Sequence, residues 1–95
     1  MAKKEKVHAL LFWAGWCSGC PAMKPLFYDE AKACNVKYDL IDVEEPNGVN
    51  LSIKYGVRNV PTILFFKGKK LVGRESGNSS YLKIQKYANK GKSAI

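Results

Sequence analysis

The segment Val7–Trp13 constrains the fold of this chain more than any other, because its apolar character is nearly continuous. A strand with one face in water alternates apolar and polar residues, whereas a strand buried on both faces has no need to. We therefore expect Val7–Trp13 to be a central strand of a sheet that helices cover on both sides. Ala14 and Gly15 end this strand.

A helical pattern follows the first strand and begins at Cys20. Its small or apolar residues recur at the spacing of one helix face, at Met23, Phe27, Ala31 and Cys34. Pro21 falls in the first turn, where proline is tolerated, but Pro25 lies deeper and should kink the helix. Asn35 is a plausible end for it.

The rest of the chain contains three more strands and two more helices. The predicted strands are 36–43, 60–66 and 70–75, and the predicted helices are 49–55 and a last one capped by Ser79, with apolar area from Leu82, Ile84, Tyr87 and Ala88. Turns are expected at Pro46–Gly48 and Lys67–Lys69. Gly56 should end the short helix, and Gly77 should break the chain before the last one.

The order strand–helix–strand–helix–strand–strand–helix predicts an α/β fold with a four-stranded mixed sheet and three helices. A helical crossover makes the first two strands parallel neighbours with a right-handed connection, and the final hairpin is antiparallel. We expect one domain over residues 1–95, with a core at about 7–90, because this length leaves no room for a second core.

The composition excludes several classes of protein. No apolar stretch is long enough to span a bilayer, and the apolar run after the basic start leads straight into the cysteine motif, so we expect no membrane contact and no targeting segment. Three cysteines, an odd number, do not suggest a secreted disulfide scaffold. We expect a monomer in the reducing environment of the cytoplasm.

The formal net charge of +8 comes from lysines scattered over both ends, a turn and the last helix. We interpret them as a solvated surface rather than a nucleic-acid site, since no nucleic-acid-binding motif accompanies them. A basic face that binds an acidic protein is the alternative.

The motif Trp16-Cys17-Ser18-Gly19-Cys20 carries the chemistry. Two thiols at this spacing can close a disulfide at the start of a helix, where free N–H groups favour the thiolate. The thiolate is the form that attacks disulfides, so the motif indicates thiol–disulfide exchange. A metal site is not expected, because these cysteines have no further ligands at a matching spacing in distant Cys34 or His8.

Several motifs in order resemble the thioredoxin family. The segment Phe12–Cys20 resembles its FWAxWCxxC sequence, Pro25 its helix proline, and Lys54–Thr62 its KYGVxxxPT sequence. Phe66–Gly68 is similar to its last hairpin, and Gly77 to the glycine before its last helix. The resemblance covers roughly residues 7–90. It implies a trimmed thioredoxin fold, without the usual N-terminal strand and helix and closer in outline to glutaredoxins.

The resemblance also implies roles for individual residues. Cys17 is the nucleophile and Cys20 resolves the mixed disulfide, with no cofactor beyond the redox-active Cys17–Cys20 disulfide. A substrate-binding surface is implied for Trp16, Val60, Pro61 and Gly77, with a cis peptide bond before Pro61. Supporting roles are implied for Trp13, Ser18, Gly19 and Pro25.

The sequence departs from the family pattern at the site. Leu11 stands where the family has a buried acid that assists the second cysteine, and Leu40 where it has the paired lysine. Water or another group must therefore accept the proton of Cys20, and Asp39 and Asp42 are candidates for that group. Gly19 replaces a proline of the family, and we expect the disulfide to be more oxidising as a result.

Three functions remain open from the sequence. The first is a protein-disulfide reductase that a thioredoxin-reductase-like flavoenzyme reduces in turn. The second is a glutaredoxin-like enzyme recycled by glutathione, and the third is a thioredoxin-fold scaffold that binds a partner protein. Structural interpretations also exist for single residues: Trp13 and Trp16 as packing residues, His8 as part of a strand, and Cys34 as a buried thiol.

Overall fold

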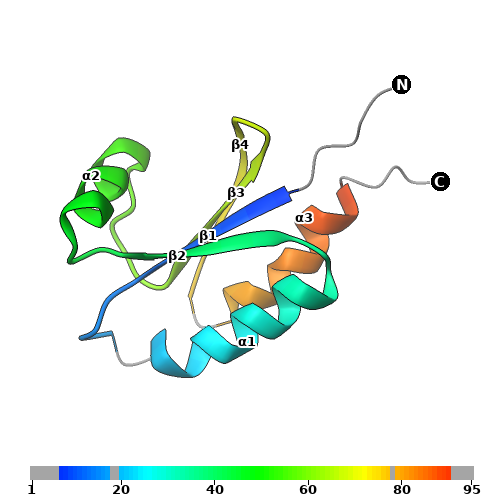
Figure 1. Cartoon of the computed structure of the whole chain (residues 1–95), viewed down its shortest axis with the longest axis horizontal. Coiled ribbons are helices and arrows are strands. Elements are labelled where there is room, and N and C mark those ends of the chain that lie inside the picture. The colour runs from blue at the N-terminus through cyan, green and yellow to red at the C-terminus, as the bar shows by residue number, and fades with distance from the viewer. Residues whose placement is uncertain (1–6, 18–19, 78, 91–95) are drawn as a thin grey trace.

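The computed structural model describes residues 7–17, 20–77 and 79–90, and its elements follow the predicted order (Figure 1). The strands are β1 (Val7–Trp13), β2 (Lys37–Asp42), β3 (Thr62–Lys67) and β4 (Lys70–Ser76). The helices are α1 (Cys20–Ala33), α2 (Pro46–Tyr55), the 3-10 helix η1 (Ser80–Lys83) and α3 (Ile84–Lys90). The strands form one mixed sheet in the order β2-β1-β3-β4, in which only the β1–β2 pair is parallel. The predicted fold class and the central place of β1 are confirmed.

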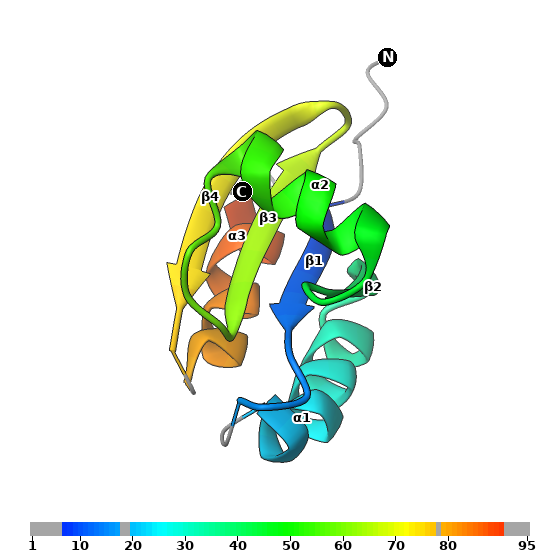
Figure 2. The same ribbon diagram turned by 90° about the vertical axis from the view of Figure 1, so that its left-hand side faces the viewer.

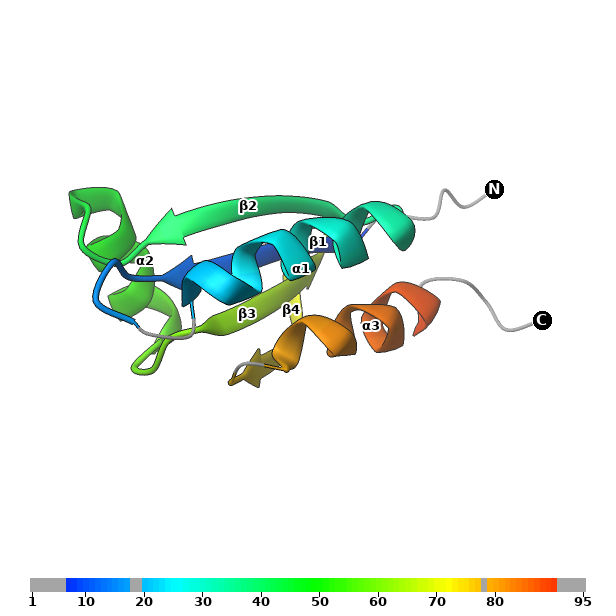
Figure 3. The ribbon, with the colours of Figure 1, turned by 90° about the horizontal axis from the view of Figure 1, so that it is seen from below.

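Helices cover both faces of the sheet, with α1 and α3 on one side and α2 on the other (Figures 2 and 3). Successive residues of β1 point to opposite faces. Ala9 and Leu11 belong to the core cluster that contains the α1 and α3 residues, whereas Phe12 joins Leu64 in the cluster packed by α2. All four side chains are fully buried. This arrangement explains why β1 is apolar at adjacent positions.

Helix α1 buries the predicted stripe and ends where the sequence indicates. Its core-facing side chains are Met23, Phe27 and Ala31. Asn35 adopts a left-handed conformation with φ 58°, its N–H bonds to the carbonyl of Lys32, and the Val36 N–H bonds to that of Ala31. This is the Schellman pattern of helix termination. The helix continues through Pro25.

Helix α2 corrects the turn predicted at residues 46–48. Pro46 is its first residue, a position where a missing N–H costs no hydrogen bond. Gly48 is needed for close packing rather than for a turn, because a Cβ built there would lie 1.8 Å from the carbonyl oxygen of Asp42. The predicted end at Gly56 is confirmed by its φ of 67°.

The last helix starts differently from the prediction. Ser79 occupies the N-cap position, yet within the described residues its side chain caps no backbone N–H. The Ser80 hydroxyl instead donates to the Gly77 carbonyl at 2.7 Å, and the first turn is the 3-10 helix η1. Leu82, expected to supply apolar area, leaves 53% of its surface exposed and adds little to the core. Ile84 is buried as expected.

Tyr87 of α3 secures the helix to the sheet. Its ring stacks on Phe65 with 4.2 Å between centroids, and its hydroxyl donates to Glu75 at 2.9 Å. Burial, and then the hydrogen bond and charge of Glu75, raise the pKa of Tyr87 above its ordinary value. Gly73 makes room for the ring, since a Cβ there would lie 2.1 Å from it.

Gly48→Ala tests the close approach of α2 to the end of β2. Helix propensity alone would make this change stabilising by up to about 1 kcal/mol. The steric conflict with the Asp42 carbonyl should instead lower the free energy of unfolding by about 1–3 kcal/mol. Urea denaturation measures the difference. Gly15→Ala is the matched control, because its added Cβ would make only an ordinary contact at 3.5 Å with Glu44.

Candidate active site

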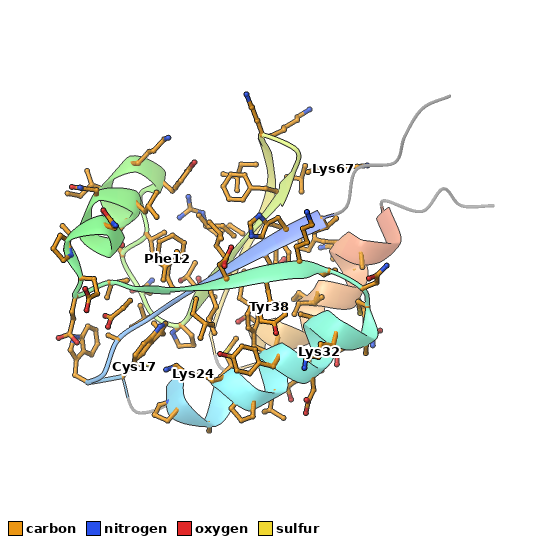
Figure 4. The ribbon with its side chains drawn as sticks, in the orientation of Figure 1. Phe12, Cys17, Lys24, Lys32, Tyr38 and Lys67 are labelled. Carbon is orange, nitrogen blue, oxygen red and sulfur yellow. The ribbon has the colours of Figure 1, made fainter. Side chains whose placement is uncertain are left out.

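The cysteine motif lies at the carboxyl ends of the parallel strands β1 and β2, the edge at which open α/β sheets commonly form ligand sites. Directly after β1 the chain makes a tight turn, closed by a hydrogen bond of 3.1 Å from the Cys17 N–H to the Ala14 carbonyl. Helix α1 begins three residues later at Cys20. Figure 4 shows Cys17 near the start of α1, at the end of the molecule away from Lys32 and Lys67.

Cys17 is largely enclosed and takes part in a disulfide. Only 8% of the residue is exposed, and it forms a small buried cluster with Ala14. Trp13, Val43 and Val60 pack against this cluster. Ser18, Gly19 and the side chain of Cys20, its predicted partner, lie outside the described part of the chain. Cys17 therefore presents only a small part of its surface to a reagent.

The predicted substrate-binding residues come from three separated parts of the sequence. The Val60–Pro61 peptide bond is cis, as the family resemblance implies. Val60 packs against the cluster of Ala14 and Cys17, and the Gly77 N–H donates to the Pro61 carbonyl at 3.0 Å. Trp16, next to Cys17 in sequence, leaves 68% of its surface exposed. The fold thus brings Val60, Pro61 and Gly77 to the Cys17 edge and leaves an aromatic surface beside it.

Lys24 is a site residue that the sequence interpretation missed. Its Nζ atom lies 3.2 Å from the centroid of the Trp13 ring, and Trp13 packs against the cluster of Cys17 (Figure 4). A cation over an aromatic face gains about 0.5–2 kcal/mol, more when water is excluded. The available signal was helical spacing, because Lys24 lies one turn after Cys20 on α1.

The two interior positions of β1 and β2 where an acid and a lysine are expected are apolar. Leu11 is fully buried and faces Leu40 across the parallel pair of β1 and β2. The two positions where the family is expected to carry an acid and a lysine are therefore neighbours here, and both are leucines that pack in the same cluster. An ionised group there would have to be desolvated, whereas this pair carries no such penalty.

The carboxylates near the site lie at its margin. Asp42 faces Trp13 in the sheet register, and its Oδ1 accepts a hydrogen bond of 2.8 Å from the Glu44 N–H. The Glu44 carboxylate in turn accepts from the Gly15 N–H at 3.4 Å. Asp39, the other candidate proton acceptor, is bonded at 2.8 Å to His8 near the opposite end of the strands. Of the two candidates, only Asp42 lies at the Cys17 end.

Residues 7–17, 20–77 and 79–90 offer neither a metal centre nor a membrane-spanning helix. These residues contain no group of three or more His, Cys, Asp or Glu side chains that could hold a metal ion. None of the helices they form is long and apolar enough to cross a membrane.

Comparison with known proteins agrees with the fold. The family model described as thioredoxin matches residues 1–90. A thioredoxin from Buchnera aphidicola is 32% identical over 87 residues, which cover 92% of this chain and 80% of that protein. The X-ray structure of Fasciola hepatica thioredoxin is 29% identical with a TM-score of 0.80, and the match covers 94% of this chain and 84% of that one.

A second solved structure, spinach chloroplast thioredoxin f in its short form, is 27% identical with a TM-score of 0.79, over 94% of this chain and 79% of that one. The fold and the cysteine site define a thioredoxin-like protein. The chain belongs to the thioredoxin family. Membership supports thiol–disulfide oxidoreductase activity in general.

Lys24→Met tests the contact between α1 and Trp13. Methionine keeps most of the side-chain volume and removes the charge, so the free energy of unfolding should fall by about 0.5–2 kcal/mol. Tryptophan fluorescence of the folded protein should change as well. The control is Lys69→Met, which removes an exposed charge from the hairpin turn at the other end of the sheet. Equal losses of stability in the two variants would contradict the assigned contact.

Proposed function

We propose that this protein reduces protein disulfides by dithiol exchange through Cys17 and Cys20. The observation that carries the proposal is the meeting of a buried, disulfide-bonded Cys17 with the cis Val60–Pro61 segment at the start of α1. Exchange with a small disulfide would require only the two cysteines. The adjoining segment supplies a surface on which a polypeptide substrate can lie.

The exchange takes two steps, and in each one S–S bond forms as another breaks. The Cys17 thiolate attacks a substrate disulfide, forms a mixed disulfide and releases one substrate sulfur as a thiolate. The Cys20 thiolate then attacks the Cys17 sulfur and releases the second substrate thiolate. The substrate gains two electrons, the Cys17–Cys20 disulfide forms, and both released thiolates can take protons from water.

The substrate-binding surface follows from the same geometry. Val60 is half-buried beside Cys17, and its backbone can pair with an extended substrate segment as an added strand. The exposed Trp16 indole, next to Cys17 in sequence, offers apolar contact as well. We therefore expect protein disulfides in extended segments to be better substrates than small disulfides.

The deprotonation of Cys20 distinguishes this protein from the pattern expected in its family. Leu11 and Leu40 stand where that pattern has an acid and a lysine. We infer that water accepts the Cys20 proton. Among the side chains, Asp42 is the candidate acceptor, because it faces Trp13 in the register and so lies at the Cys17 end of the sheet.

The electron donor and the setting are also part of the proposal. We expect a thioredoxin-reductase-like flavoenzyme to regenerate the dithiol in the cytoplasm, with the protein acting as a monomer. The apolar Leu11 favours a second candidate, a glutaredoxin-like enzyme recycled by glutathione. Turnover with NADPH and reductase, compared with turnover with glutathione and glutathione reductase, separates these two donors.

Substitution of each cysteine tests the exchange. Cys17→Ser should abolish insulin reduction, because the nucleophile is lost. Cys20→Ser should accumulate mixed disulfides on Cys17, which mass spectrometry of non-reduced samples would identify. Cys34→Ser is the control and should retain activity, since Cys34 packs against the main core cluster at the far end of α1.

Two results would overturn the proposal. One is insulin reduction by Cys17→Ser at the rate of the wild type. The other is full function of that variant in cells, which would favour a scaffold that binds a partner protein through its fold.

A further inference from the structure

Arg74 links the edge strand β4 to the end of helix α2. Its Nη1 donates to the Gly56 carbonyl at 3.2 Å, and its Nη2 donates to the Tyr55 carbonyl. The last carbonyls of a helix lack partners within the helix and carry the negative end of its dipole. A guanidinium offers two donors in a fixed fork, so one side chain satisfies both carbonyls.

The loop that starts at this link is the one that reaches Cys17. Residues 57–61, which we call the proline loop, connect α2 to β3 and run beside β4 (Figure 2). They contain Val60, whose side chain packs against the cluster of Ala14 and Cys17. Arg74 therefore holds the first end of the segment proposed to receive the substrate.

The other end of the proline loop is tied to the same strand. The Gly77 N–H, just after β4, donates to the Pro61 carbonyl at 3.0 Å. The Thr62 hydroxyl lies 3.0 Å from the Ser76 hydroxyl and donates to the Asn59 carbonyl at 2.7 Å. Strand β4 and the residue after it thus bind both ends of the proline loop. Arg74 binds the residues just before the loop, and Ser76 and Gly77 bind Thr62 and Pro61 at its end.

A loop of five residues held at both ends has little freedom. Without Arg74, the loop start would keep its bonds to α2, from the Gly56 N–H to Ile53 and from the Val57 N–H to Ser52. The end of α2 would lose its link to β4, so it could shift relative to the sheet together with Val57 and the exposed Arg58. Pro61 and Thr62 would stay in place through their own bonds. The displacement would enter at Arg58 and reach Val60 by pulling on Asn59, whose carbonyl is bonded to Thr62.

We propose that Arg74 is a positioning residue that sets the proline loop for binding of protein disulfides. It lies exposed on the edge strand and acts on the site through Tyr55 and Gly56. The proposal rests on the proposed function for its substrate. It assigns the substitution effect to substrate binding rather than to the reactivity of Cys17.

The test uses insulin reduction with an excess of reductant, for wild type, Arg74→Met, Arg74→Lys and the control Lys70→Met. Arg74→Met keeps an apolar stem but removes both donors, so KM should rise about three- to tenfold, with a smaller change in kcat. Arg74→Lys retains a charge and can reach one carbonyl, so its KM should be intermediate. Lys70→Met removes an exposed charge from the same strand and should match wild type.

Backbone amide exchange provides a second readout that does not need activity. Exchange at residues 57–60 should be faster in Arg74→Met than in Lys70→Met, while exchange in β1 stays the same. A KM equal to that of wild type in Arg74→Met would overturn the inference, as would an equal rise in KM in Lys70→Met. If Arg74→Met does not fold, an unchanged KM in Arg74→Lys overturns it instead.

The two proposals fail in different ways. If wild-type protein reduces no insulin, the proposed function is wrong, and the exchange measurement still decides whether Arg74 holds the loop. If wild type is active and Arg74→Met binds insulin normally, only the role of Arg74 is wrong.

Discussion

Burial of β1 on both faces is the constraint on which the rest of this structure depends. Leu11 and Phe12 are adjacent in sequence, point to opposite sides of the sheet and are both fully buried. Full burial of such a side chain contributes about 1.5–3 kcal/mol. One side chain requires the layer of α1 and α3, and the other requires α2. Because β1 lies between these layers, the turn at its carboxyl end holds Cys17 in a defined place.

The same burial shapes the chemistry of the site. Leu11 and Leu40 fill the positions where the family is expected to carry a buried acid and a lysine. Charged groups lie near Cys17 instead, with Lys24 over Trp13 and Glu44 beside Gly15. An apolar interior avoids the cost of a desolvated charge. For the proposed exchange, this means that protons are gained and lost at the surface of the site rather than through a buried acid.

The sequence predicted most of the fold because its patterns were local. The run of β1, the stripe of α1 and the left-handed end at Asn35 each depend on neighbouring residues. The errors arose where local preference and packing differ. The residues Pro46–Gly48 are typical of a turn, but they begin a helix that packs closely on the end of β2. At 3.6 residues per turn, Leu82 lies well away from the helix face that carries Ile84 and Tyr87, so it is exposed while they are buried.

The sequence by itself determined the order of the elements and indicated the chemistry proposed for the site, since the cysteine spacing and the proline segment are readable as motifs. Only the tertiary structure decided which side chains surround them. Nothing in the sequence distinguishes Lys24 from the other lysines, but in the fold its ammonium lies over Trp13. Arg74 is likewise an ordinary charged residue in the sequence, but in the fold it binds the end of α2. The reason is physical: motifs record contacts between residues near in sequence, whereas these contacts depend on how whole elements pack.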